Sequence, residues 1–163
     1  MSVTRSVGVA AALVAAYYLL PLDWHGAGVT ALILVGGLLA LGVFFGWEVR
    51  LIIRSSRPRL KAVEAVAVTA VLYLVLFASG YYLLERTAPG SFTTHLTRTD
   101  ALYFTLSTFT TVGFGDITPV SQTGRVLAMC QMACGVLLAG VAVRVLTSAV
   151  RVGLRRQGRG PPE

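Results

Sequence analysis

Long apolar stretches alternate with short polar segments along this chain. The apolar stretches span residues 3–20, 27–47, 62–84 and 124–150. A bilayer core needs about 20 apolar residues per spanning helix. The pattern therefore predicts an all-α membrane protein in which four transmembrane helices cross the bilayer.

The segment between the last two apolar stretches is predicted to enter the membrane without crossing it. Residues 85–99 are polar and are predicted to form an external loop. Thr99 or Asp100 is then the expected N-cap of a short helix over residues 100–110. Such a helix rises only about 16 Å, roughly half of the hydrocarbon thickness. Irregular backbone at that depth must be buried in protein or line water, which predicts a re-entrant loop with an oligomer around it.

Composition supports a membrane protein, and the placement of charge predicts its orientation. The chain has 163 residues, of which 55% are hydrophobic and 13% charged, which is too apolar for an ordinary soluble domain. Most basic residues fall on one side of the predicted spans, so the positive-inside rule places both termini in the cytoplasm. The excess of Arg over Lys, with abundant Ala, Val and Gly, favours a bacterial plasma membrane. That side holds Arg5, Arg50, Arg54, Arg57, Arg59, Lys61, Arg151, Arg155, Arg156 and Arg159.

Two basic segments, residues 48–61 and 151–163, are predicted to be a cytoplasmic loop and a cytoplasmic tail. The net charge of +7 is compatible with a nucleic acid partner in general. Its location at the ends of apolar stretches argues against nucleic acid and fits anionic lipid headgroups instead. The alternative interpretation is that these segments are solvated and only set the topology.

Residues 1–47 are predicted to form an N-terminal transmembrane hairpin. A signal peptide is the competing interpretation for residues 3–20, because Arg5 precedes an apolar core; a small-x-small cleavage site before Pro21 is missing. Gly42 and Gly46 form a motif that allows close helix packing, here expected against the third apolar stretch. A voltage sensor needs arginines spaced along a membrane helix, and this hairpin has no such series.

The run Thr111-Val112-Gly113-Phe114-Gly115 can present backbone oxygens to a cation. Successive carbonyl groups turn to the same side only if the backbone alternates between right- and left-handed conformations, and left-handed φ is cheap for glycine alone. Gly113 and Gly115 supply it at every second position. We expect ligands from the backbone of Thr111 to Phe114, with the Thr111 hydroxyl as one more oxygen, and the side chains of Val112 and Phe114 pointing away from the lumen.

The longer run from Thr108 to Asp116 resembles the signature of potassium channels, in which four loops replace the hydration shell of an ion by carbonyl rings. The resemblance extends from about residue 62 to residue 150. It implies a pore domain with an outer helix (62–84), a turret (85–99), a pore helix (100–110), a filter (111–115) and an inner helix (124–150). It further implies a homotetramer that passes potassium, with no cofactor and no catalytic residue.

The same resemblance assigns support roles around the filter to Gly115, Asp116, Tyr103, Phe104 and Ser107. Many members of the family hydrogen-bond a filter tyrosine to a pore-helix tryptophan, and the corresponding residues here are Phe114 and Phe104. Aromatic packing alone is therefore expected to hold the filter. Tyr103 is expected to donate a hydrogen bond to Asp116, and Ser107 stands where some relatives carry a glutamate.

Two glycines of the inner helix are candidates for a gating hinge. Gly135 matches the hinge glycine of the family, and Gly140 is a second weak point. A glycine can allow a helix to bend when the cytoplasmic mouth opens. Close packing against another helix is the alternative interpretation of Gly135.

These features predict a potassium-selective channel that conducts passively. A poorly selective monovalent cation channel is one alternative, and a non-conducting auxiliary subunit is another. An enzyme is the least favoured class, because the membrane segments carry no His/Asp/Glu or Ser/Lys constellation suited to catalysis.

Overall fold

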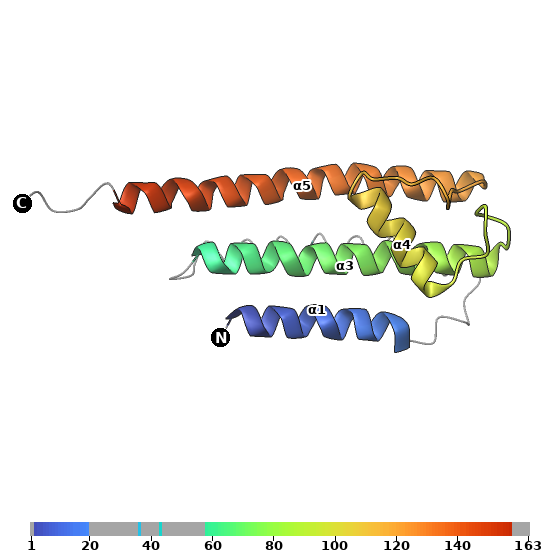
Figure 1. Ribbon diagram of the computed structural model, residues 1–163, viewed down its shortest axis with the longest axis horizontal. Coiled ribbons are helices and arrows are strands. Elements are labelled where there is room, and N and C mark those ends of the chain that lie inside the picture. The colour runs from blue at the N-terminus through green and yellow to red at the C-terminus, as the bar shows by residue number, and fades with distance from the viewer. Residues whose placement is uncertain (1, 20–35, 37–42, 44–57, 158–163) are drawn as a thin grey trace, which may run out of the picture.

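A computed structural model describes residues 2–19, 36, 43 and 58–157 of the chain. Its named helices are α1 (Ser2–Leu19), α3 (Pro58–Thr87), α4 (Arg98–Phe109) and α5 (Gln122–Gln157). The three long helices lie side by side, and the short α4 is inclined between α3 and α5 near one end of the molecule (Figure 1). Apart from Gly36 and Val43, the predicted second span lies outside the described residues.

Two of the described helices are long and apolar enough to cross a membrane. These segments are Val63–Thr87 in α3 and Gln122–Arg144 in α5, and both exceed the length that a bilayer core requires. The described part of the chain is helical apart from its turns and one isolated antiparallel bridge, which pairs Phe92 with Pro119. The structure is thus that of an α-helical membrane protein, while the count of four spans stays a prediction.

The long helices extend beyond the bounds predicted from the apolar pattern. Helix α3 begins at Pro58 rather than at residue 62, because proline fits the first helical position, where its missing N–H costs nothing. Helix α5 continues to Gln157 instead of ending at residue 150. Arginine, leucine and glutamine are good helix formers, so the helix continues where the apolar pattern stops. The start of the predicted tail is therefore helical.

The predicted N-cap of the short helix was wrong by two or three residues. Thr97 caps α4, and Asp100 is the third helical residue in a capping box. The Thr97 hydroxyl accepts from the Asp100 backbone N–H (3.2 Å), and the Asp100 carboxylate accepts from the Thr97 N–H (3.0 Å). The hydroxyl and backbone N–H of Thr97, which both donate to this carboxylate, lower the pKa of Asp100. The predicted end, residue 110, is the C-cap that follows Phe109.

Aromatic side chains pack α3 against α4 and the loop between them. Tyr81 of α3 meets Phe104 of α4 with ring centroids 4.9 Å apart, and Phe92 of the loop contacts both rings at 5.6 and 5.5 Å. All three pairs have the edge-to-face geometry that aromatic quadrupoles favour. This cluster sets the inclination of α4, and with it the position of the segment that follows.

Candidate ion-binding site

The C-terminal end of α4 holds the first residues of the candidate filter. The backbone N–H groups of Val112 and Gly113 donate to the carbonyl oxygen of Ser107 at 3.0 and 3.2 Å, and that of Thr110 donates to Leu106 at 2.9 Å. The last carbonyl groups of a helix have no partner within it. Here the Ser107 carbonyl is bound by the N–H groups of Val112 and Gly113, so hydrogen bonds join the end of α4 directly to the candidate filter.

The backbone of this segment alternates in handedness over five residues. Thr111, Gly113 and Gly115 have φ values of 61°, 54° and 81°, while Val112 and Phe114 between them do not have positive φ. The alternation expected from the two glycines therefore extends to Thr111. A β-branched residue in a left-handed conformation is strained by about 1–3 kcal/mol. Threonine normally avoids that region, so no local signal predicts this strain.

The ring that supports Phe114 within the chain comes from Tyr103. Their planes are 8° apart with centroids separated by 6.1 Å. Phe104 packs against Tyr81 and Phe92 of the aromatic cluster and also lines the cavity beside Gly113 and Gly115, so its expected support role stays a prediction. Consecutive residues of a helix point about 100° apart, so Tyr103 and Phe104 meet this segment from different sides, at Phe114 and at the cavity.

The hydrogen bond expected at the filter exit is present. The Tyr103 hydroxyl donates to Oδ2 of Asp116 at 2.9 Å. Ser107, at the position where some relatives carry a glutamate, donates its hydroxyl to the Phe104 carbonyl at 3.1 Å and receives the two filter N–H groups on its own carbonyl. Ser107 thus contacts this segment through its backbone carbonyl. The identity of its side chain does not predict this contact.

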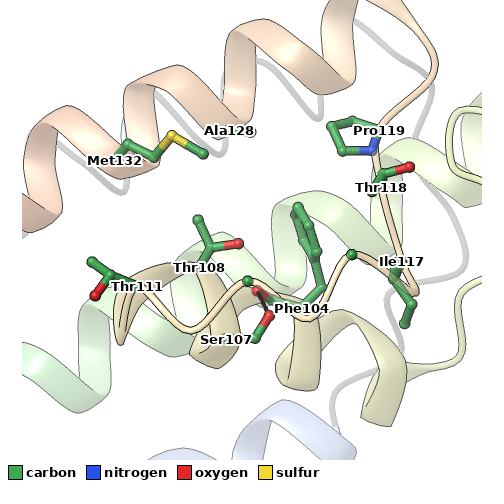
Figure 2. Close-up of a pocket in the computed structure, with 11 residues that line it drawn as sticks. Phe104, Ser107, Thr108, Thr111, Ile117, Thr118, Pro119, Ala128 and Met132 are labelled. Atoms are coloured by element: carbon green, nitrogen blue, oxygen red, sulfur yellow. Dashed lines mark hydrogen bonds between the residues drawn. The ribbon is translucent and has the colours of Figure 1, made fainter.

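A cavity of about 410 Å³ lies between the filter segment, α4 and α5. Figure 2 shows Thr108 and Thr111 on one side of it and Ala128 and Met132 of α5 on the other. Gly113 also lines the cavity. Within one chain, this cavity therefore separates the candidate filter from α5, and the wall that α5 provides through Ala128 and Met132 is apolar.

The loop before α4 is joined to the exit of the filter by main-chain hydrogen bonds. The N–H of Thr93 donates to the Thr118 carbonyl at 3.0 Å, and those of Val120 and Ser121 donate to the Ser91 carbonyl at 2.9 and 3.1 Å. The Thr93 hydroxyl in turn accepts from the Thr118 N–H at 3.1 Å. Residues 91–93 and residues 118–121 therefore form one hydrogen-bonded unit.

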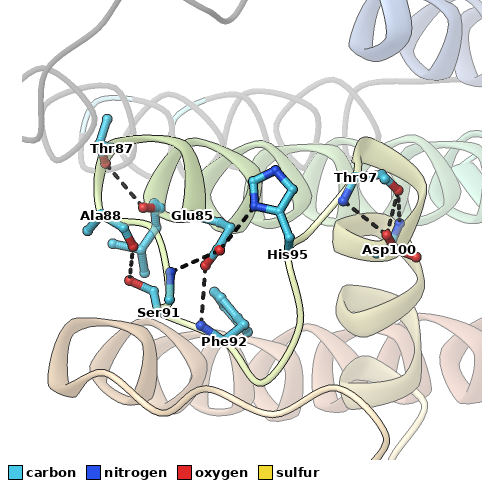
Figure 3. A network of polar contacts seen from close by, with 10 residues as sticks. Glu85, Thr87, Ala88, Ser91, Phe92, His95, Thr97 and Asp100 are labelled. Atoms are coloured by element: carbon cyan, nitrogen blue, oxygen red, sulfur yellow. Dashed lines mark hydrogen bonds and ion pairs between the residues drawn. The ribbon is translucent and has the colours of Figure 1, made fainter.

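A buried carboxylate anchors this loop to the end of α3. Glu85, 1% exposed, accepts from the N–H groups of Gly90 and Phe92 at 3.1 and 3.2 Å (Figure 3). His95 Nδ1 lies 3.4 Å from the same carboxylate on an otherwise exposed ring. The anchor ties the loop to the C-terminal end of α3.

A buried amide that the sequence analysis did not single out links all three helices of the pore region. Gln131 of α5 is fully buried, and its side chain accepts from the Tyr81 hydroxyl at 2.6 Å and donates to the Thr105 carbonyl at 2.9 Å. Its backbone carbonyl accepts from the Tyr73 hydroxyl. One feature of the sequence could have indicated this role. Gln131 is a polar residue within an apolar stretch, and a buried amide needs hydrogen-bond partners inside the protein.

Gly135 packs closely against its neighbours, as the alternative interpretation of this glycine proposed. A Cβ atom placed there would lie 3.0 Å from the Tyr73 hydroxyl and 3.5 Å from Phe109. A Cβ atom at Gly140 would meet nothing within 4 Å. Helix α5 runs without interruption through both positions, and their role as hinges stays a prediction.

We expect Gly135→Ala and Gly140→Ala to change stability in opposite directions. Alanine at position 140 gains about 1 kcal/mol of helix propensity with no contact to crowd it. At position 135 that gain is outweighed by displacement of Tyr73, so unfolding should become easier by about 1 kcal/mol. Thermal unfolding of the purified variants in one detergent measures both. Equal stabilisation of the two variants would show that close packing does not restrict position 135.

Comparison with known proteins places this arrangement in a family. Residues 68–152 match a family model described as "Ion channel". Among relatives, the potassium voltage-gated channel protein shk-1 of Caenorhabditis elegans is 39% identical over 87 residues, which cover 53% of this chain and 16% of that protein. The calcium-gated potassium channel TvoK of Thermoplasma volcanium is 40% identical over 60 residues, 36% of this chain and 17% of that protein.

A third relative has a similar degree of likeness. The inward rectifier potassium channel Kirbac3.1 of Paramagnetospirillum magnetotacticum is 34% identical over 82 residues, which cover 46% of this chain and 26% of that protein. The alignments thus span about a quarter or less of these relatives. Since the family model covers more than half of this chain, the protein belongs to the ion channel family, and the relatives named here are potassium channels.

Proposed function

We propose that this protein is a potassium-selective channel that conducts potassium passively through a homotetrameric pore. The observation that carries the proposal is the regular alternation of φ at Thr111, Gly113 and Gly115. This backbone form turns successive carbonyl groups to one side, as a site that replaces the water around a cation requires. The ligands are the backbone oxygens of Thr111, Val112, Gly113 and Phe114, with the Thr111 hydroxyl, and potassium is the permeant ion.

Four copies of the chain complete the site, because one segment supplies only part of a coordination ring. The filter segment and one side of α5 offer surfaces for neighbouring copies. Phe114 is 70% exposed in a single chain, and Val136 and Leu137 of α5 are 72% and 71% exposed. Large apolar side chains in such numbers require cover by another subunit or by lipid. Around the shared axis, the C-terminal end of each α4 contributes a partial negative charge that favours a cation.

The surrounding residues support this filter in the proposed channel. Gly115 allows the last left-handed step, and Tyr103 restrains Asp116 at the exit. Selectivity for potassium is favoured because the Gly113-Phe114-Gly115 element of the potassium-channel signature is intact. We further propose that the protein lies in the bacterial plasma membrane with four spans and both termini in the cytoplasm, where its basic segments meet anionic headgroups.

Ion flux from liposomes that contain the purified protein tests the proposal. We expect potassium efflux with a membrane potential set by potassium, and no sodium efflux under the same gradient. Flux of both ions would instead support a poorly selective cation channel. Absence of flux from a correctly assembled tetramer would support an auxiliary subunit, and a monomer in native membranes would contradict the whole mechanism. Empty liposomes are the control.

A further inference from the structure

The end of α1 and the start of α4 are joined by the side chain of Arg98. Its guanidinium Nη1 donates to the backbone carbonyl oxygens of Tyr17 and Tyr18 at 2.6 and 2.7 Å. Both carbonyls belong to the last turn of α1, where no helical N–H is left to bind them. A cation at this end also interacts favourably with the helix dipole. Arg98 therefore caps a helix that lies about 80 residues away in the sequence.

The contact is reciprocal and includes a third helix. The Tyr17 hydroxyl, on a side chain only 1% exposed, donates to the Arg98 carbonyl at 2.7 Å. The Tyr18 hydroxyl lies 3.2 Å from Oγ1 of Thr99. The Arg98 guanidinium also lies over the ring of Tyr82 in α3, 5.2 Å from its centroid, a distance suited to a cation–π interaction. Three helices thus meet at the first residue of α4.

We propose that α1 braces the pore helix α4, and that Arg98 is a positioning residue for the filter. The inference rests on the proposed channel function. Helix α4 has 12 residues, and its far end binds the filter N–H groups through the Ser107 carbonyl. A helix of three turns is stiff, so its first residue sets where its last turn lies. The segment matched by the family model starts at residue 68, so α1 is a support added to the matched pore module.

The brace is tested first by hydrogen exchange, which needs no ion flux. In the full-length protein in nanodiscs, Arg98→Ala should raise amide exchange of residues 98–113 about tenfold, because charge-assisted hydrogen bonds are lost. Tyr17→Phe removes one neutral hydrogen bond and should raise it about threefold. Arg98→Lys should fall between wild type and Arg98→Ala, because an ammonium group keeps the charge but lacks the planar fork of the guanidinium.

Arg86→Ala is the matched control. The Arg86 guanidinium also lies over the Tyr82 ring, 5.8 Å from its centroid. Arg86→Ala therefore removes one positive charge beside this ring, as Arg98→Ala does, but keeps the contacts of Arg98 with α1. Exchange in residues 98–113 should then stay at the wild-type rate. An increase confined to α1 in Arg98→Ala would mean that Arg98 only caps that helix, and would overturn the proposal.

Potassium flux provides the second readout. Per tetramer, flux should fall about tenfold in Arg98→Ala, in line with the exchange effect, and recover in part in Arg98→Lys. Wild-type flux in all variants, with altered exchange, would show that the brace does not position the filter. If the wild-type protein itself carries no flux, the proposed function fails, while the exchange pattern along residues 98–113 still decides whether α1 braces α4.

Discussion

Replacing Gly113 with alanine is expected to abolish potassium flux while the protein still assembles. Gly113 has a φ of 54°, and a Cβ atom there would meet nothing within 4 Å in its own chain. The penalty therefore comes from the backbone conformation, which costs an L-residue about 1–2 kcal/mol. In a tetramer the penalty applies four times, about 4–8 kcal/mol in total. The filter should leave the alternating conformation, with a loss of flux of more than about 100-fold.

The control for this variant is Gly8→Ala. Gly8 lies within α1, and a Cβ atom there also meets nothing within 4 Å, but its φ is helical rather than left-handed. Alanine at this position should preserve flux, since it improves helix propensity and leaves the filter unchanged. Liposome flux is measured together with chemical cross-linking of the tetramer. Potassium flux and selectivity at wild-type levels in Gly113→Ala would contradict the carbonyl mechanism.

The second large effect is expected at the buried amide of Gln131. Gln131→Leu keeps the side-chain volume nearly constant but removes the acceptor of the Tyr81 hydroxyl and the donor to the Thr105 carbonyl. Unpaired polar groups in a buried site should lower the free energy of unfolding by about 2–3 kcal/mol. Tyr81→Phe removes only one hydroxyl and should lower it by about 1 kcal/mol. The double variant should lose about 1 kcal/mol less than the sum of the two.

Tyr73→Phe provides the matched control for this cycle. The Tyr73 hydroxyl donates to the backbone carbonyl of Gln131, which remains when the side chain is changed. Residues in contact couple, but because the backbone acceptor of Tyr73 remains, the coupling of Tyr73→Phe with Gln131→Leu should be smaller than that of Tyr81→Phe. The measurement is equilibrium unfolding of all single and double variants in the same detergent micelles. Equal coupling for Tyr81 and Tyr73 would refute the assignment of the side-chain hydrogen bond.

The helices and the left-handed backbone at Gly113 and Gly115 could be predicted because their signals are local. Apolar stretches of membrane length located α3 and α5 to within a few residues at their outer ends, since composition determines which segments a bilayer accepts. Helix bounds were less accurate where polar residues continue a helix, as at Gln157. The N-cap was predicted wrongly, although the sequence contains a signal for the correct residue. Thr97 has an acidic residue three positions later, as a capping box requires, whereas Thr99 has Leu102 at that position.

The contacts that were missed join residues distant in sequence or oppose local preference. Gln131 binds groups 26 and 50 residues away, and Arg98 binds carbonyl groups about 80 residues away. No local pattern reports such pairs, because they depend on how the helices pack. Thr111 takes a conformation that its own β-branched side chain disfavours, so only the surrounding structure can impose it.

The hydrogen bonds that join residues 91–93 to residues 118–121 have a consequence for how this part of the protein can evolve. Three of them connect main-chain atoms of Ser91 and Thr93 to those of residues 118–121. Main-chain partners persist whatever side chain a residue carries, except where proline replaces a donor. The side chains of these two segments can therefore change by substitution, for instance toward another charge, while the hydrogen bonds that join the segments stay in place.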